Sequence, residues 1–241
     1  MPYPQSTSVA HRPAPGDRPW IFAGAGTLAA VAGYVNVVVL GVFAVPVSHM
    51  SGAVSRLGID LAAGNRADLT VILAIVLGFL AGAVLSGAII GNRKLVPGRR
   101  YGFALFLEGG VLALATSYLY AGNSAGIVLA AMACGIQNAM ASSYYGLVIR
   151  TTHVTGIVTD IGVIIGYWIR GRTVRVWKLL LLVVILTGFF TGGFLGAVMY
   201  AAIGRIALAL ASAGCITAGA TYFLWRHLRR HTRFRAARSR R

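Results

Sequence analysis

Long apolar runs constrain this chain more than any other feature of its sequence. An α-helix rises about 1.5 Å per residue, so about 20 apolar residues cross the roughly 30 Å hydrocarbon layer of a bilayer. Only 11% of the 241 residues are charged, against roughly 25% in soluble domains. Runs of the required length lie near residues 20–45, 69–91, 101–121, 125–149, 178–202 and 205–225. We therefore predict an all-α integral membrane protein with six transmembrane helices.

A short segment occurs twice, and neither copy belongs to one of the long runs. Ser48–Gly58 and Thr152–Gly162 align without a gap at a spacing of 104 residues. In this alignment His49 faces His153, and each Ser of the first copy faces a Thr of the second. Each copy begins with small polar residues and continues for about half the thickness of a bilayer. We expect each to form a re-entrant half-helix, near residues 48–64 and 152–169.

The placement of the basic residues determines the expected topology. The net charge of +17 is concentrated in the loops 92–100 and 170–178 and in the tail 226–241. If both half-helices crossed the membrane, the loop 92–100 would lie outside, against the positive-inside rule. If neither crosses, nearly all basic loops and both termini are cytoplasmic. We therefore expect a protein of the bacterial cytoplasmic membrane with both termini inside.

With three spans in each half, the two halves would insert in opposite orientations, as a 3+3 inverted repeat. Two further echoes support a duplication: Gly33–Asn36 resembles Gly135–Asn138, and Gly78–Gly82 resembles Gly188–Gly192. The glycine-spaced pairs in the second echo are typical of close helix packing in lipid. The predicted organisation is a disordered tail at 1–19, repeat 1 at 20–121, repeat 2 at 122–225 and a basic cytoplasmic tail at 226–241.

The starts of the two half-helices are the candidate substrate site. A helix N-terminus near the bilayer midplane offers unpaired N–H groups and partial positive charge, which suit an anion or a polar solute. We predict that Ser51 and Thr155 cap these termini and that the glycines after them leave donors open. The candidate substrate-binding residues are His49, Ser51, Gly52, Ser55, His153, Thr155, Gly156, Thr159, Asn36, Gln137 and Asn138. The alternative is structural: histidines that bond backbone carbonyls, hydroxyls that only cap, and amides that join helices.

Three charged residues are candidates for gating or proton coupling. Arg56 and Asp160 occupy matched positions of the repeat, so we predict that they approach each other or flank one cavity. Glu108 lies inside an apolar run, where an acid is expected to be neutral or paired toward the bundle interior. A purely structural ion pair is the alternative for Arg56 and Asp160.

Several function classes find no support in the sequence. The two histidines of the repeat lack clustered Cys or carboxylate partners, so no metal or cofactor is expected. Cys134 and Cys215 lie in apolar runs and are expected to be small buried hydrophobes. We find no nucleotide-binding loop and no nucleophile with a base, so no enzyme is predicted. The Arg-rich tail is expected to bind anionic lipid rather than nucleic acid, and a homodimer remains open.

The motifs also resemble a known family. Gly135–Ala139 followed by Thr151–Gly156 is similar to the signature of the YoaK-like family of uncharacterised bacterial membrane proteins. The resemblance covers about residues 20–225. The family usually has Asp where Asn36 stands and Thr-Gly-Asn where Ser51–Ala53 stands; if that Asp couples a proton in relatives, this chain has lost that coupling. The family has no agreed substrate, so the resemblance implies an architecture and a permease-like activity only.

The sequence therefore predicts a small secondary transporter, a permease or exporter, for an unidentified small polar or anionic solute. The solute would bind between the half-helices at the bilayer midplane. A passive channel is the first alternative, because six transmembrane helices together with two half-helices also suit a pore. A membrane scaffold or lipid-handling protein with a tightly packed centre is the second.

Overall fold

The computed structural model describes residues 18–43, 47–90, 99–142 and 151–238, and all regular structure in them is helical. This confirms the all-α prediction for the described part of the chain. The helices are α1 (Arg18–Phe43), α2 (Met50–Ala62), α3 (Arg66–Ile90), α4 (Arg99–Tyr120), α5 (Ala125–Ser142), α6 (Val154–Ile169), α7 (Val176–Ile203), a 3-10 turn η3 (Gly204–Ile206) and α8 (Ala207–Arg238).

Several helices are long and apolar enough to cross a membrane. Four stretches meet this criterion among the described residues: Pro19–Val42, Arg66–Ile90, Arg100–Tyr120 and Val176–Leu224. The last stretch contains α7, η3 and the apolar part of α8, and the positive φ of 62° at Gly204 marks the break between them. The apolar stretches Ala125–Ala141 in α5 and Val154–Ile169 in α6 are shorter. The predicted continuation of the α5 run to residue 149 lies outside the described residues.

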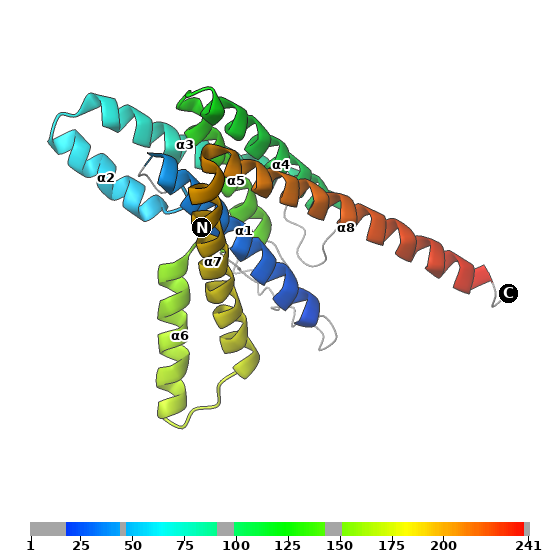
Figure 1. Cartoon of the computed structure of the whole chain (residues 1–241). Coiled ribbons are helices and arrows are strands. Elements are labelled where there is room, and N and C mark those ends of the chain that lie inside the picture. The colour runs from blue at the N-terminus through cyan, green and yellow to red at the C-terminus, as the bar shows by residue number, and fades with distance from the viewer. Residues whose placement is uncertain (1–17, 44–46, 91–98, 143–150, 239–241) are drawn as a thin grey trace, which may run out of the picture.

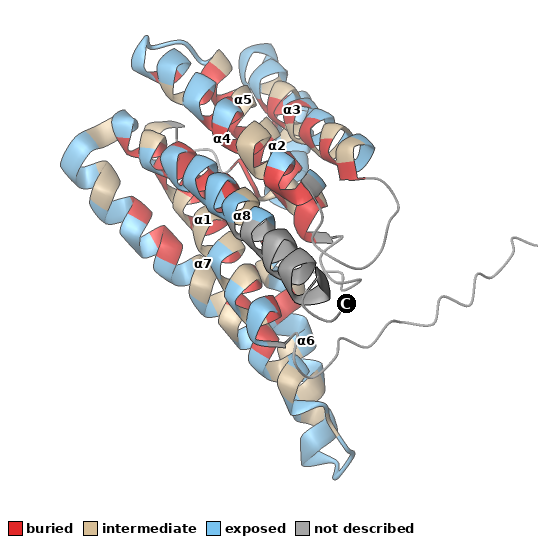
Figure 2. Ribbon diagram, turned by 90° about the vertical axis from the view of Figure 1, so that its right-hand side faces the viewer, coloured by how far each residue is buried: buried red, intermediate tan, exposed pale blue. Residues whose placement is uncertain are grey.

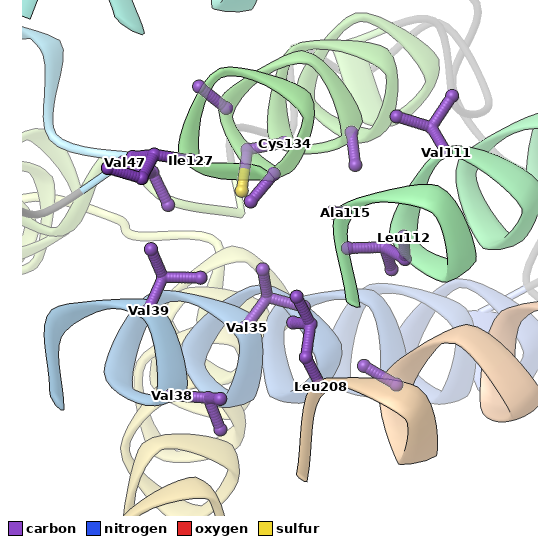
Figure 3. Close-up of a cluster of buried hydrophobic side chains, with 14 of the residues drawn as sticks. Val35, Val38, Val39, Val47, Val111, Leu112, Ala115, Ile127, Cys134 and Leu208 are labelled. Carbon is purple, nitrogen blue, oxygen red and sulfur yellow. The ribbon is translucent and has the colours of Figure 1, made fainter. Parts of the chain in front are cut away.

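Three helix pairs build the body of the bundle. α1 packs on α7, α3 packs on α5, and α4 packs on α8, while α4 also contacts α5 (Figure 1). The buried residues form stripes along these helices and leave their outer faces exposed (Figure 2). The main core joins α1, α4, α5 and α8, with Val35, Leu112, Cys134 and Leu208 among its members (Figure 3). Both cysteines are buried and free, as the sequence predicts.

Glycines lie where the crossing helices approach most closely, and they do so twice in the same way. A Cβ on Gly33 of α1 would overlap the carbonyl oxygen of Phe189 in α7. A Cβ on Gly135 of α5 would overlap the carbonyl oxygen of Phe79 in α3. The glycines are 102 residues apart and the phenylalanines 110 apart, which are the spacings of the two echoes in the sequence. The α1–α7 and α3–α5 contacts are therefore equivalent: α5 corresponds to α1, and α3 corresponds to α7.

The reciprocal contacts follow the same rule. A Cβ on Gly192 would overlap the Ala30 carbonyl oxygen, and a Cβ on Gly82 would overlap the Met132 carbonyl oxygen. Gly192 and Gly82 are 110 residues apart, and Ala30 and Met132 are 102 apart. The small-residue pattern thus serves close helix packing, as predicted.

The directions of the paired helices follow from the order of their contacts. Along α1 and α7 the residue numbers rise together, from Gly26 beside Val184 to Gly41 beside Tyr200, so these helices are parallel. Along α4 and α8 they run in opposite senses. Gly102 lies beside Gly219, and Gly109 beside Ser212, so α4 and α8 are antiparallel.

The two short helices form hairpins with the helices that follow them. α2 has 13 residues and packs on α3, whereas α6 has 16 and packs on α7 (Figure 1). A glycine with a φ of 68° follows the C-cap of each helix, Gly64 after α2 and Gly171 after α6, and residues with a Cβ rarely adopt this conformation. In both turns the same pair of backbone hydrogen bonds closes the helix end, including Asn65 N–H to Asp60 and Arg172 N–H to Tyr167. At about 1.5 Å per residue, both helices are shorter than the hydrocarbon layer is thick.

Candidate functional site

The starts of α2 and α6 are built alike. The helices begin at Met50 and Val154, directly after His49 and His153. These histidines occupy the N-cap positions, with neither side chain making a capping hydrogen bond. The first helical hydrogen bonds are also equivalent, since Ala53 N–H bonds the carbonyl of His49 and Ile157 N–H that of His153, both at 3.1 Å.

The prediction that Ser51 and Thr155 cap the helices is wrong. Each lies at the second helical position, two residues beyond the N-cap. Both side chains are exposed. One turn later, the hydroxyl of Ser55 donates to the Ser51 carbonyl at 3.0 Å, and that of Thr159 donates to the Thr155 carbonyl at 2.9 Å. These hydroxyls therefore satisfy their own helices, and each retains lone pairs toward the exposed side.

An asparagine anchors the residues in front of each half-helix. In the first half, the Ser48 hydroxyl donates to Asn36 Oδ1 at 2.7 Å, and both residues are buried. In the second half, Asn138 Nδ2 donates to the Thr152 hydroxyl oxygen at 2.6 Å, and the Thr151 hydroxyl donates to Asn138 Oδ1 at 3.4 Å. Each asparagine follows a crossing glycine, Gly33 or Gly135, by three residues. Both half-helices thus begin about one turn away from the two closest helix crossings.

The two histidines have different surroundings. His49 is half-buried, and its ring meets Phe189 of α7 edge to face, with centroids 6.0 Å apart and the planes at 61°. His153 is exposed, and its ring lies against the backbone of Gly156, where a Cβ would overlap Nδ1. The starts of α2 and α6 therefore have the same backbone structure and the same asparagine anchors, but their histidine rings lie in different surroundings.

The start of α2 has open space beside its first turn. A Cβ built on Gly52 meets nothing within 4 Å. The first N–H groups of any helix lack intrahelical acceptors and carry partial positive charge. Gly52 therefore places no side chain beside these donors, and ligand binding there stays a prediction.

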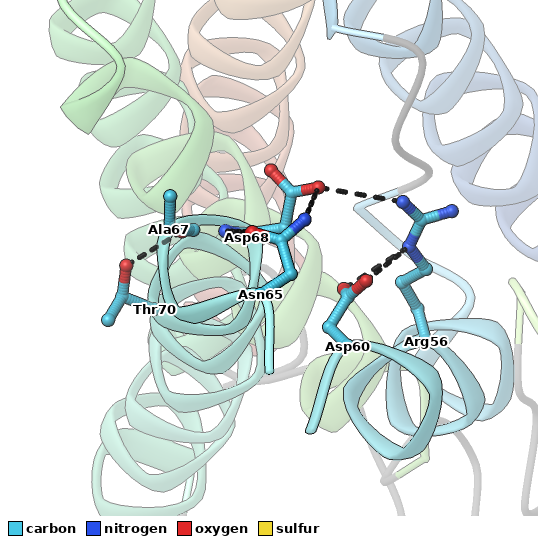
Figure 4. Close-up of polar contacts among 6 residues, drawn as sticks. All are labelled: Arg56, Asp60, Asn65, Ala67, Asp68 and Thr70. Carbon is cyan, nitrogen blue, oxygen red and sulfur yellow. Dashed lines mark hydrogen bonds and ion pairs between the residues drawn. The ribbon is translucent and has the colours of Figure 1, made fainter. Parts of the chain in front are cut away.

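Arg56 and Asp160 do not pair. Arg56 Nε lies 3.2 Å from Asp60 Oδ1, and Arg56 Nη2 lies 3.6 Å from Asp68, which also accepts a 2.8 Å hydrogen bond from Asn65 (Figure 4). Asp160 is exposed on α6. The physical reason is geometry: the matched positions lie seven residues beyond the N-caps, about 10 Å along helices that lead away from each other.

The remaining predicted residues lie deeper in the bundle. Gln137 is 1% exposed, and its Nε2 donates to the Leu28 carbonyl at 2.7 Å, so its amide joins α5 to α1. Glu108 is also 1% exposed, in the interior as predicted. Neither is brought to the half-helix starts by a contact in the described structure.

Four further polar residues around this site were not predicted from the sequence. Ser48, Thr151 and Thr152 anchor the half-helices, and Asp60, 3% exposed, holds Arg56. A signal was present for Ser48 and Thr152, because they are equivalent positions of the repeat. Asp60 falls four residues after Arg56, the spacing at which helical side chains of opposite charge meet.

Comparison with known families locates the chain among its relatives. The family described as proteins of unknown function, DUF1275, matches residues 25–221. The chain belongs to this family. The match covers nearly the same residues as the resemblance to uncharacterised membrane proteins and includes both half-helices. No curated protein and no solved structure matches the chain.

Proposed function

We propose that this DUF1275 member is a small secondary transporter for a polar or anionic solute, which binds between the starts of α2 and α6. The observation that carries the proposal is the matched anchoring of the two helices. Asn36 with Ser48 and Asn138 with Thr152 hold two helix N-termini beside the central crossings. Paired half-helices of this kind provide substrate sites in transporters built from inverted repeats.

The helix directions support six spans and an inverted repeat. From α4 to α8 the chain passes α5, α6 and α7, and three full crossings would leave α4 and α8 pointing the same way. They are antiparallel, which fits α5 and α7 crossing and α6 returning to its own side. α1 and α7 are parallel, which fits α2 returning to its own side as well. Equivalent helices such as α4 and α8 then run in opposite directions through the bilayer, as in an inverted repeat.

The polar faces of the half-helices support a water-filled route. Ser51, Ser55, Thr155, Thr159 and Asp160 are all exposed. Polar side chains at membrane depth are costly unless they line a cavity or meet a partner. A route between the two hairpins would solvate them, and a homodimer covering these faces is the other arrangement that would satisfy them.

The ends of the chain complete the proposal. α8 continues to Arg238, well beyond its apolar part, and projects from the body of the bundle (Figure 1). We assign this basic extension to the cytoplasmic side, where it would bind anionic lipid head groups. Both termini are then cytoplasmic.

A thermal-shift screen of the purified protein against small anions and polar solutes tests the site. The matched variants are Gly52→Leu and Gly58→Leu, because both glycines lie in α2 and a Cβ on either meets nothing within 4 Å. A solute that raises the unfolding temperature of the wild type should do so for Gly58→Leu and fail for Gly52→Leu. Equal shifts in both variants would contradict a site at the start of α2.

A channel would share this site, and flux measurements separate the two functions. A solute found in the screen is added to proteoliposomes that contain the protein, and a proton gradient is imposed across their membrane. A coupled transporter accumulates the solute above its external concentration and loses this when the gradient is collapsed. Equilibration that ignores the gradient would make the protein a channel.

A further inference from the structure

Glu108 is the single glutamate of the chain and lies near the middle of α4. Its side chain is 1% exposed, and its Oε2 has no hydrogen-bond partner in the described structure. One turn along the same helix, Leu112 belongs to the main apolar core. An unpaired charged oxygen is very costly in such surroundings, whereas a protonated carboxyl is tolerated. Packing alone would be served better by an apolar residue, so this acid calls for a function.

Two thiols are the titratable neighbours of Glu108 among the described residues. The thiol of Cys215 on α8 hydrogen-bonds the carboxyl, and Cys134 on α5 lies close enough to interact with it electrostatically. The charges on other elements packed against α4 are remote. Arg205 of η3 donates to the Leu119 carbonyl at 3.1 Å, about three turns from Glu108, and α3 has its charges in its first turn.

One helix, α5, carries polar side chains both near this carboxyl and at the start of α6. Cys134 and Asn138 are four residues apart, so they lie on the same face of α5. Asn138 in turn bonds Thr152 at 2.6 Å and Thr151 at 3.4 Å, directly before His153. A proton moving between Glu108 and the candidate substrate site would therefore follow this face of α5.

We propose that Glu108 is an exchangeable proton-binding site inside the bundle. The carboxylate takes up one proton to form a neutral acid and releases the same proton, with no other bond made or broken. Resting on the transport function proposed above, this names the proton as the coupling ion. Glu108 has no acidic counterpart in the second half, where the 110-residue spacing leads to Ala218. The site therefore breaks the symmetry between the repeats.

Infrared difference spectroscopy tests the proposal on the full chain in liposomes as the pH is stepped across neutrality. The wild type should give a protonated-carboxyl C=O band that loses intensity at alkaline pH. Glu108→Gln should abolish this band, and Asp160→Asn, which alters an exposed acid, should retain it. Cys215→Ala should move the band to higher frequency, because the carboxyl loses a hydrogen bond from the thiol.

A band that survives Glu108→Gln would overturn the proposal, as would a Glu108 band that stays unchanged at every pH at which the protein is folded. Glu108→Asp, with a displaced band, serves as the second variant if Glu108→Gln does not fold. The readout needs no solute. If Glu108 titrates but no solute binds, the proposed transport function is wrong and the proton site stands. If a solute binds but Glu108 does not titrate, the proton site is wrong and the transport function stands.

Discussion

The Ser48 hydroxyl donates a 2.7 Å hydrogen bond to Asn36, and this bond fixes where the first half-helix begins. Asn36 lies on α1, one turn from the crossing with α7, so the bond ties the start of α2 to the most closely packed part of the bundle. The Asn138–Thr152 bond does the same for α6. The two bonds thereby hold the starts of both short helices close to the tightest helix contacts of the bundle.

Removing this anchor should destabilise the protein. Asn36→Leu leaves the buried Ser48 hydroxyl without its acceptor, a loss of about 1–3 kcal/mol in the free energy of unfolding. Asn36→Asp keeps an oxygen in the same place and should stay nearer the wild type. Thermal unfolding in detergent measures both. Equal unfolding temperatures for the Asp and Leu variants would show that the bond does not matter.

The close helix crossings should not tolerate a methyl group. Gly192→Ala places a Cβ against the Ala30 carbonyl, which is helix backbone and cannot swing aside, so the α1–α7 pair must separate. We expect a loss of about 1–3 kcal/mol. Gly214→Ala on α8 is the control, because its Cβ meets nothing within 4 Å. The prediction fails if both variants unfold at the same temperature.

Variants of the two histidines should distinguish a role in packing from a role in solute binding. His49→Ala removes the ring contact with Phe189 and should lower the unfolding temperature, whereas the exposed His153→Ala should leave it nearly unchanged, within about 0.5 kcal/mol. The double variant should insert normally yet lose solute binding in the thermal-shift assay. Full binding by the double variant would reduce both residues to structural roles.

The charges of the α2–α3 hairpin should behave as a local cluster. Arg56→Ala leaves the buried Asp60 without its cation and should cost about 1–3 kcal/mol. Asp68→Ala removes the longer, exposed contact and should cost less than about 1 kcal/mol. Exchanging Arg56 with Asp160 should be as harmful as Arg56→Ala alone. Rescue by that exchange would restore the pairing that the geometry argues against.

Much of this fold could be predicted from the sequence, because lipid makes apolar length a direct measure of a crossing helix. The duplication was visible because His49 and His153 are rare residues at matched positions. The repeated glycine patterns predict the close contacts between helices, since only a residue without a Cβ permits backbones to approach so closely.

The details of the site could not be predicted in the same way. The N-caps fall two residues before Ser51 and Thr155, because the asparagine anchors hold the chain in front of the helices. Such bonds join residues 12 to 14 positions apart, which no helical period connects. The Arg56–Asp60 pair was not predicted, because Arg56 and Asp160 occupy matched positions of the repeat and were expected to approach each other.

The sidedness of four single cysteines tests the central claim, that neither α2 nor α6 crosses the membrane. Ser8→Cys, Val96→Cys, Val174→Cys and Ser124→Cys are introduced one at a time into a chain without Cys134 and Cys215, and are labelled with a membrane-impermeant thiol reagent in intact and opened cells. We predict that the first three react only from the cytoplasm, while Ser124→Cys reacts from outside. Ser8 and Val96 on opposite sides would mean that α2 crosses, Val96 and Val174 on opposite sides would mean that α6 crosses, and either result would contradict the account.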